Sequence, residues 1–210
     1  VRAYLHVNGY FTATEYPLVE AGRGQAPRSV TDIDLLAIRF GHRVADTDAL
    51  AGGQNKIVGP VVETCDPALG SADEATDMIL GEIKQGRAHV NAGARNFNAL
   101  AATLHRFGCC PADTAPKRAR DLVQRGSVTN PTGHRIRMVL FASRGDHAPH
   151  GWHLVHLGHV FRFLDHYLRS DGAVLSAAQL LDPALGWLAL LKKCDLKLAP
   201  VLAQENRHDH

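Results

Sequence analysis

The chain has 210 residues, which is enough for one domain with its own hydrophobic core. Hydrophobic residues make up 45% and charged residues 21%, and no stretch approaches the roughly 20 apolar residues of a membrane-spanning helix. The beginning of the chain does not resemble a signal peptide. The four cysteines include no C-x-x-C pair and suggest reduced thiols, so we expect a cytoplasmic protein.

Arginine supplies most of the positive charge of the chain. The net charge is only +2, but 17 arginines outnumber 6 lysines, and there are 13 histidines. Arginine is the residue best suited to bidentate contacts with phosphate, so this bias weakly favours a phosphate-bearing partner. A GC-rich coding sequence would produce the same enrichment, and charge alone does not decide between the two explanations.

The first third of the chain predicts a hairpin. A short helical turn ends at Gly9, and residues 10–19 combine aromatic and β-branched residues with partial alternation, as in a strand. A loop rich in glycine, proline and serine follows, and residues 30–40 form a second strand. Residues 41–77 are expected to be mostly loop, with one apolar patch at 56–64.

The remaining elements alternate in type. Residues 77–84 predict a third strand, and residues 94–108 place apolar side chains three and four apart, which indicates an amphipathic helix that ends at Gly108. A fourth strand over 134–144 and helices over 156–170 and 182–193 complete the series. This order predicts an α/β protein in which helices pack on a mixed sheet.

Opposite charges stand together at the end of the third strand, as Glu82-Ile83-Lys84. Side chains alternate along a strand, so Glu82 and Lys84 should emerge on one face. Asp34 on the neighbouring strand could join Glu82 and the Ile83 carbonyl around Mg²⁺, which needs few protein oxygens when a substrate phosphate and waters complete its shell. Lys84 could then orient or activate a water. The set predicts metal-assisted hydrolysis of a phosphodiester bond.

Ordinary structural roles would produce the same pattern. Asp34, Glu82 and Lys84 could form an exposed ion pair, which contributes roughly 0–1 kcal/mol. Asp32, two residues before Asp34, is either a solvent-facing strand residue or part of the same site.

These residues resemble those of a known family. An Asp on one strand and Glu-x-Lys on the next, in the order hairpin, strand, helix, strand, resembles the PD-(D/E)XK nuclease superfamily, which includes restriction endonucleases and Holliday-junction resolvases. The segments LHVNGYF, TDIDLLAIRF and DMILGEIKQGR are also similar to a group of uncharacterised bacterial proteins with this core. The resemblance covers about residues 1–143 of what we expect to be a single domain, with a C-terminal helical part over about 152–195.

The resemblance implies a restriction endonuclease-like fold and assigns roles residue by residue. Asp34 and Glu82 would be metal ligands with the Ile83 carbonyl, Lys84 would be the catalytic lysine, and Gln85 and Arg87 would lie near substrate phosphate. The cofactor would be Mg²⁺, with Mn²⁺ able to substitute, and the partner would be nucleic acid, expected to be DNA. Resolvase-like members commonly form homodimers, so the resemblance also makes a homodimer plausible.

Two features depart from the family pattern. Resolvase-like members often carry a glutamate on a helix ahead of the first strand, whereas the first acidic residue here is Glu15; Glu15 or Glu20 could serve in its place. The spacing of 48 positions from Asp34 to Glu82 exceeds a simple hairpin, so the intervening segment is an insertion that could act as a clamp or lid.

Histidines recur every third residue from His147 to His159. Imidazoles three apart on a helix could chelate Zn²⁺, but Pro149 and Gly151 interrupt the first part, and exposed histidines near a turn explain the pattern equally simply. Trp152 and Trp187 are expected to pack rather than to stack on bases.

The sequence therefore supports a leading function and an alternative. The first is a metal-dependent endonuclease that acts on DNA in repair, recombination or defence. The second is a catalytically inactive module on the same fold, which would bind nucleic acid or protein.

Overall fold

The computed structural model describes residues 1–20, 28–41, 65–71, 75–170 and 182–196. These residues divide into two compact units, 1–160 and 161–210, which are described separately. Over the described residues the protein is α/β, with five α-helices and six strands in one mixed sheet. This confirms the α/β class and the mixed sheet, while the single domain stays a prediction.

The first unit begins with the predicted hairpin. Helix α1 (Arg2–Val7) ends before Gly9, whose φ of +82° suits glycine, and strand β1 (Phe11–Glu20) pairs antiparallel with β2 (Arg28–Arg39). Strand β2 then pairs antiparallel with β3 (Asp77–Arg87). The expected loop over 41–77, including its apolar patch, lies mostly outside the described residues.

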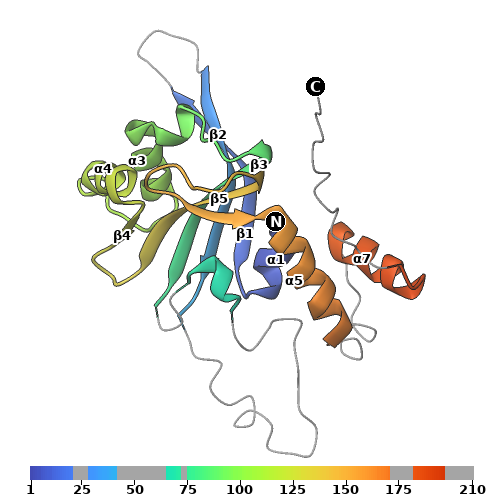
Figure 1. Ribbon diagram of the computed structural model, residues 1–210. Coiled ribbons are helices and arrows are strands. Elements are labelled where there is room, and N and C mark those ends of the chain that lie inside the picture. Colours follow the sequence, from blue (N-terminus) through green and yellow to red (C-terminus); the bar gives the residue numbers. More distant parts are fainter. Residues whose placement is uncertain (21–27, 42–64, 72–74, 171–181, 197–210) are drawn as a thin grey trace, which may run out of the picture. The chain divides into compact units, whose positions relative to one another are not determined.

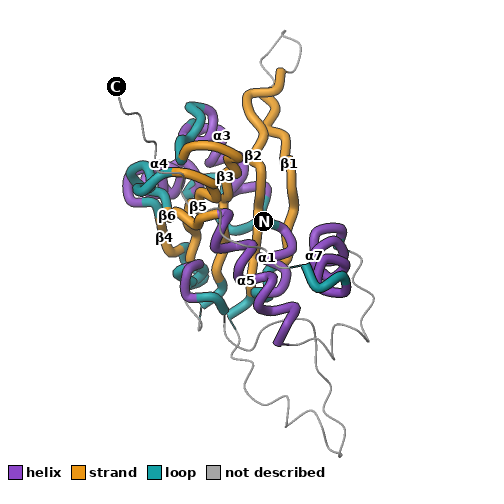
Figure 2. Tube along the Cα trace, turned by 45° about the vertical axis from the view of Figure 1, so that its right-hand side comes forward, coloured by secondary structure: helices purple, strands orange, loops and turns teal. Residues whose placement is uncertain are grey.

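A crossover through two helices returns the chain to the sheet. Strand β3 lies parallel to β5 (Arg135–Arg144), which also pairs with two short strands and gives the order β1-β2-β3-β5-β4 with β6 beside β5. The crossover helices α3 and α4 lie together on one side of the sheet, and α1 lies on the other (Figures 1 and 2). The remaining elements of this part are α3 (Phe97–Arg106), α4 (Ala115–Arg125), β4 (Ser127–Thr129), β6 (His153–His156) and the 3₁₀ turns η1 (Pro67–Leu69) and η2 (Gly93–Arg95).

One face of the sheet packs against α3 and α4. Alternate residues of β3 and β5 enter this core, where they meet small and aliphatic side chains of the two helices. Asn96 caps α3 by accepting hydrogen bonds from the backbone N–H groups of Asn98 and Ala99. The sheet contributes Met78, Leu80, Ile136, Met138, Leu140 and Ala142, and the helices contribute Ala99, Leu100, Leu104, Ala115, Ala119 and Leu122.

The opposite face holds a buried polar pair. Asp77 and Arg137 form a bidentate ion pair between the first residues of β3 and β5, with 2.8 Å between Arg137 Nη2 and Asp77 Oδ2. Tyr10 donates a 2.5 Å hydrogen bond to Asp77, and Arg137 donates to the Leu69 carbonyl. Burial and the neighbouring charge of Asp77 raise the pKa of Tyr10 well above its ordinary value.

A second polar group lies on that face around Asp66. The carboxylate accepts hydrogen bonds of 2.6 Å from both Tyr4 and His159, which ties α1 to the first turn of helix α5 (Leu157–Ser170). Burial acts to raise the pKa of Asp66, but these hydrogen bonds dominate and lower it. Burial and the bond to Asp66 raise the pKa of Tyr4 far above its ordinary value.

The C-terminal unit contains the rest of α5 and helix α7 (Pro183–Lys193), as the two predicted helices require. Asp182 caps α7, and Lys192 donates a hydrogen bond to the Leu168 carbonyl. Both tryptophans were expected to pack. Trp152 is buried in the core, as expected, but Trp187 on α7 is 62% exposed, so among the described residues it does not pack as predicted. No described helix has the length and apolar character needed to cross a bilayer.

Candidate functional site

The candidate residues lie where β2 and β3 separate. The paired residues of these strands run from Arg39 with Asp77 to Leu35 with Gly81, and the pairing stops there. Strand β3 continues in register with β5 for three more residues, through Lys84 and Ala142. Strand β3 therefore remains anchored on its β5 side while its β2 side opens, and we call Asp34, Glu82, Ile83 and Lys84 the fork site.

Gly81 allows the last pair before the fork to close. A Cβ atom at Gly81 would lie 2.9–3.4 Å from three side-chain atoms of Leu35, which is buried directly opposite. A glycine in the interior of a strand often marks such a close approach. The glycine in the segment LGEIK is therefore explained by packing at the edge of the fork site.

Asp34 reaches across the fork. Its carboxylate accepts a 2.8 Å hydrogen bond from the backbone N–H of Ile83, which replaces a ladder bond between the two strands. In an extended strand the N–H and C=O of one residue point to the same side, so the Ile83 carbonyl also faces the fork. The structure thus places the Asp34 carboxylate against the backbone of Ile83, the middle residue of the Glu82-Ile83-Lys84 triplet.

Glu82 and Lys84 emerge together from β3. The Lys84 ammonium lies 2.5 Å from a Glu82 carboxylate oxygen, and the Lys84 and Glu82 side chains are 15% and 4% exposed. Glu82 has the strand phase of Met78 and Leu80, so it emerges on the face that carries α3 and α4. The pair is therefore much less exposed than a surface salt bridge.

A β-bulge brings two arginines to the same face. Between the pairs Lys84–Ala142 and Arg87–Arg144, β3 advances three residues while β5 advances two. The extra residue shifts the phase of β3, so Arg87 returns to the face of Lys84, and Arg144 lies opposite it. Like charges directly opposite each other destabilise a sheet unless an anion lies between them.

Gln85 lies within the bulge. Its backbone carbonyl accepts a hydrogen bond from the Ser143 hydroxyl, and its side chain is exposed. Sequence reasoning identified Gln85 and Arg87 but missed Arg144. The available signal was the alternation of Leu140, Ala142 and Arg144 along β5, which only the bulge connects with Arg87.

The expected upstream acid is not part of a compact carboxylate cluster. Counting the register of β1 and β2 places Glu15 opposite Asp34, but no pair forms there, and Glu15 is exposed with a φ of +54°. Glu20 pairs with Arg28 at the far end of the hairpin. Asp32 is exposed and lies opposite Pro17.

The fork site fits a hard divalent cation only in part. Two carboxylates and one carbonyl are oxygen donors of the kind that Mg²⁺ takes, and Mg²⁺ usually keeps several waters. The described residues contain no group of three or more Asp, Glu, His or Cys side chains that could hold a metal. Lys84 also engages one oxygen of Glu82. The donor set is therefore suited to a cation that a substrate phosphate helps to hold.

The histidine ladder does not form a zinc site in the described residues. The first histidines precede α5: His150 donates to the Gln124 carbonyl, and His153 on β6 donates to the Ala68 carbonyl. His159 binds Asp66. The shared helix face that chelation needs is absent from the ladder before Leu157, because β6 and a turn occupy that stretch.

No disulfide joins the four cysteines, all of which lie in the described residues. Burial raises the pKa of the Cys109 thiol to about 12, which makes it a poor nucleophile.

In comparisons with known proteins, no family model, no curated protein and no solved structure matches this chain.

Proposed function

We propose that the protein is a metal-dependent nuclease that hydrolyses phosphodiester bonds, with DNA as the expected substrate. One observation carries the proposal: where β2 and β3 separate, the Asp34 carboxylate binds the Ile83 backbone N–H between Glu82 and Lys84, which pair with each other. The Asp34 carboxylate also satisfies the Ile83 N–H that the ladder leaves without a partner, so it is held beside the Glu82–Lys84 pair. A substrate-bearing site needs both the convergence and the opening.

Each residue of the fork site then has a role. Asp34, Glu82 and the Ile83 carbonyl would hold Mg²⁺, which when bound supplies a polarised phosphoryl oxygen and a water of lowered pKa. Lys84 would leave Glu82 for the substrate, where its ammonium orients the attacking water and balances charge on the phosphoryl group. Arg87 and Arg144 would hold the neighbouring phosphates.

The topology is compatible with the restriction endonuclease-like fold that the motif suggests. The chain forms a hairpin, a third strand and a helical crossover to a parallel strand, and the motif residues lie within the second and third strands. The proposal takes from that fold the assignment of Lys84 as the catalytic lysine. A homodimer and a cytoplasmic location belong to the same proposal.

The direct test is cleavage of supercoiled plasmid and of branched DNA with Mg²⁺ or Mn²⁺. We expect Glu82→Gln and Lys84→Met each to lower the single-turnover rate by about 100-fold or more, since each removes a group aimed at the reacting phosphate. Lys117→Met is the matched control, because Lys117 is exposed on α4, and it should retain the wild-type rate. Circular dichroism confirms that each variant is folded.

Two outcomes would count against an active nuclease. Undiminished cutting by Glu82→Gln would place the activity elsewhere or in a contaminant. Tight DNA binding without cleavage under any metal would select the inactive binding module, which the Lys84–Glu82 pair and the lack of a third clustered carboxylate in the described residues favour.

A further inference from the structure

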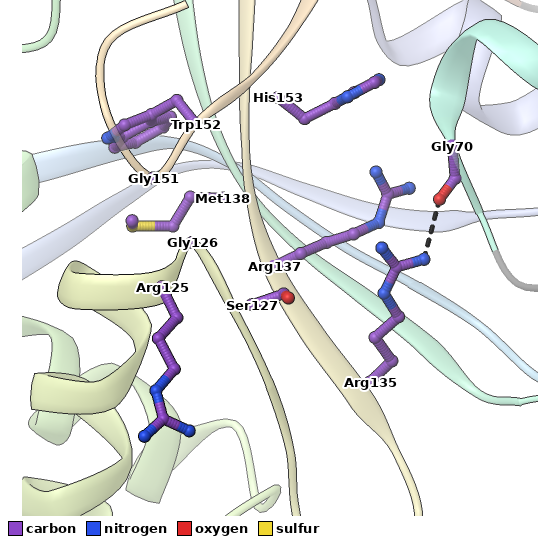
Figure 3. A pocket seen from close by; sticks show the side chains of 10 residues that line it. All are labelled: Gly70, Arg125, Gly126, Ser127, Arg135, Arg137, Met138, Gly151, Trp152 and His153. Carbon is purple, nitrogen blue, oxygen red and sulfur yellow. Dashed lines mark hydrogen bonds between the residues drawn. The ribbon is translucent and has the colours of Figure 1, made fainter.

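A second polar site lies at the edge of the sheet, where β4 and β6 begin. It is a cavity of about 310 Å³ beside the first residues of β5, within the size range of small-molecule sites. Three arginines and no acidic residue are among its ten lining residues (Figure 3), which are Gly70, Arg125, Gly126, Ser127, Arg135, Arg137, Met138, Gly151, Trp152 and His153.

The three arginines differ in how many hydrogen-bond and ion-pair partners each has within the protein. Arg137 is fully committed to Asp77, Tyr10 and the Leu69 carbonyl, so it contributes a rigid floor with little net charge. Arg135 donates one 2.7 Å hydrogen bond to the Gly70 carbonyl and is partly exposed. Arg125 is exposed at the end of α4. A carbonyl does not balance the charge of Arg135, and no described acidic residue lines the cavity, so the described residues give it about two positive charges.

The arginines approach the cavity from two sides. Arg135 and Arg137 extend from β5 toward Gly70, with their guanidinium groups near each other, whereas Arg125 lies on the other side of Ser127 (Figure 3). His153 donates through Nε2 to the Ala68 carbonyl, and this bond fixes its ring at the rim of the cavity. Guanidinium groups and a hydroxyl are donors that suit a phosphate group.

Two glycines allow two backbone segments to approach closely at the wall of the cavity. Gly126 ends α4 with a φ of +76°, and a Cβ there would lie 2.2 Å from the Gly151 carbonyl oxygen. The Met138 N–H donates to the Gly126 carbonyl, which holds this crossing against β5. The loop before β6 therefore passes directly over the end of α4, and a side chain at Gly126 would displace it.

This cavity is distinct from the fork site. Arg135 and Arg137 have the opposite strand phase to Leu140 and Ala142, whose face carries Glu82 and Lys84. Arg137 pairs with Ile79, three residues before Glu82, which is about 10 Å along the strand. The cavity shares no residue with the proposed active site, so its role goes beyond that of the proposed nuclease.

We propose that this cavity binds a phosphomonoester of about the size of a mononucleotide, with the phosphate held by Arg135 beside Ser127. Arg125, whose guanidinium points away from Arg135 in Figure 3, turns toward the phosphate on binding. A dianionic phosphate matches the two uncompensated arginines, and 310 Å³ leaves room for more than the phosphate alone. The phosphomonoester is either a free nucleotide or the terminal phosphate of a nucleic-acid strand.

The test is calorimetric titration of the full chain with AMP and with inorganic phosphate at low salt. We expect saturable binding of AMP, weakened about tenfold or more by Arg125→Gln and by Arg135→Gln. Arg120→Gln removes the same charge from the exposed surface of α4 and should bind AMP like the wild type. Arg137 is left unchanged, because its removal would break the buried pair with Asp77.

The source of the phosphate is separated with a short oligonucleotide that carries or lacks a 5′-phosphate. Tighter binding of the phosphorylated form, lost in Arg135→Gln, assigns the cavity to strand ends, and AMP binding without this preference assigns it to a free nucleotide. The proposal is overturned if neither AMP nor phosphate binds at millimolar concentration, or if Arg120→Gln weakens AMP binding as much as Arg125→Gln does. A Glu82→Gln variant should bind AMP normally, so this result is independent of the nuclease proposal.

Discussion

Strand β3 carries two ion pairs, and they are built differently. At its start, Asp77 and Arg137 are 0% and 3% exposed, and other hydrogen bonds complete both partners. In its middle, Glu82 and Lys84 are 4% and 15% exposed, where the pairing with β2 has stopped. The closed pair holds the sheet together, whereas the open pair is placed where a substrate can reach it.

The largest expected effect comes from breaking the closed pair. Arg137→Met leaves the Asp77 carboxylate buried without its cation, and we expect it to lower the free energy of unfolding by about 3–5 kcal/mol. Glu82→Gln should cost no more than about 1 kcal/mol, because Lys84 can extend its ammonium toward water. Urea unfolding measures both.

The double variant Asp77→Leu with Arg137→Met sharpens the comparison. It removes both charges, so it should be more stable than Arg137→Met alone. Equal losses for Arg137→Met and Glu82→Gln would contradict the distinction between a closed and an open pair.

A smaller effect is expected where the fork begins. Gly81→Ala places a methyl group against Leu35, and overpacking of this kind typically costs about 1–3 kcal/mol. Gly86→Ala on the same strand is the matched control, since a methyl group at Gly86 would meet no atom within 4 Å. Thermal unfolding should separate the two, and a loss for Gly86→Ala as large as that for Gly81→Ala would contradict this account of the packing.

The smallest effect is a loss of stability in alkali. The pKa values of Tyr4 and Tyr10 are raised in the folded protein, whereas both phenols ionise near pH 10 in the unfolded chain. Their contribution is therefore present below pH 10 and is lost as the pH rises, by up to about 1.4 kcal/mol per pH unit for each tyrosine. Tyr4→Phe and Tyr10→Phe should each make the fall between pH 9 and 11 shallower. If the free energy of unfolding falls with pH as steeply in both variants as in the wild type, the raised pKa values of the two tyrosines would be contradicted.

The sequence predicted the elements whose signal is periodic. Strands β1, β2, β3 and β5 and helices α3, α5 and α7 were identified, because apolar spacing alone indicates them. Helix α4 was missed because its buried positions are Ala115, Ala119 and Leu122, and two alanines give little hydrophobic signal. Strands β4 and β6 were missed because three or four residues are too few to show alternation.

The same distinction applies to the site. Asp34, Glu82 and Lys84 were predicted because a motif and a strand phase locate them. Arg144 was missed, since its place beside Arg87 depends on a bulge that only the glycine at Gly86 suggests in the sequence. The cavity beneath Gly151 depends on a close approach of two glycines 25 residues apart in the chain, which only the folded structure reveals.

The most direct test of the fork site is titration with Mn²⁺, followed by electron paramagnetic resonance of the free ion. The account predicts a site that Glu82→Gln weakens about tenfold or more, and that Lys84→Met strengthens, because the ammonium no longer competes for the Glu82 carboxylate. Mn²⁺ binding that is the same in wild type, Glu82→Gln and Lys84→Met would contradict it.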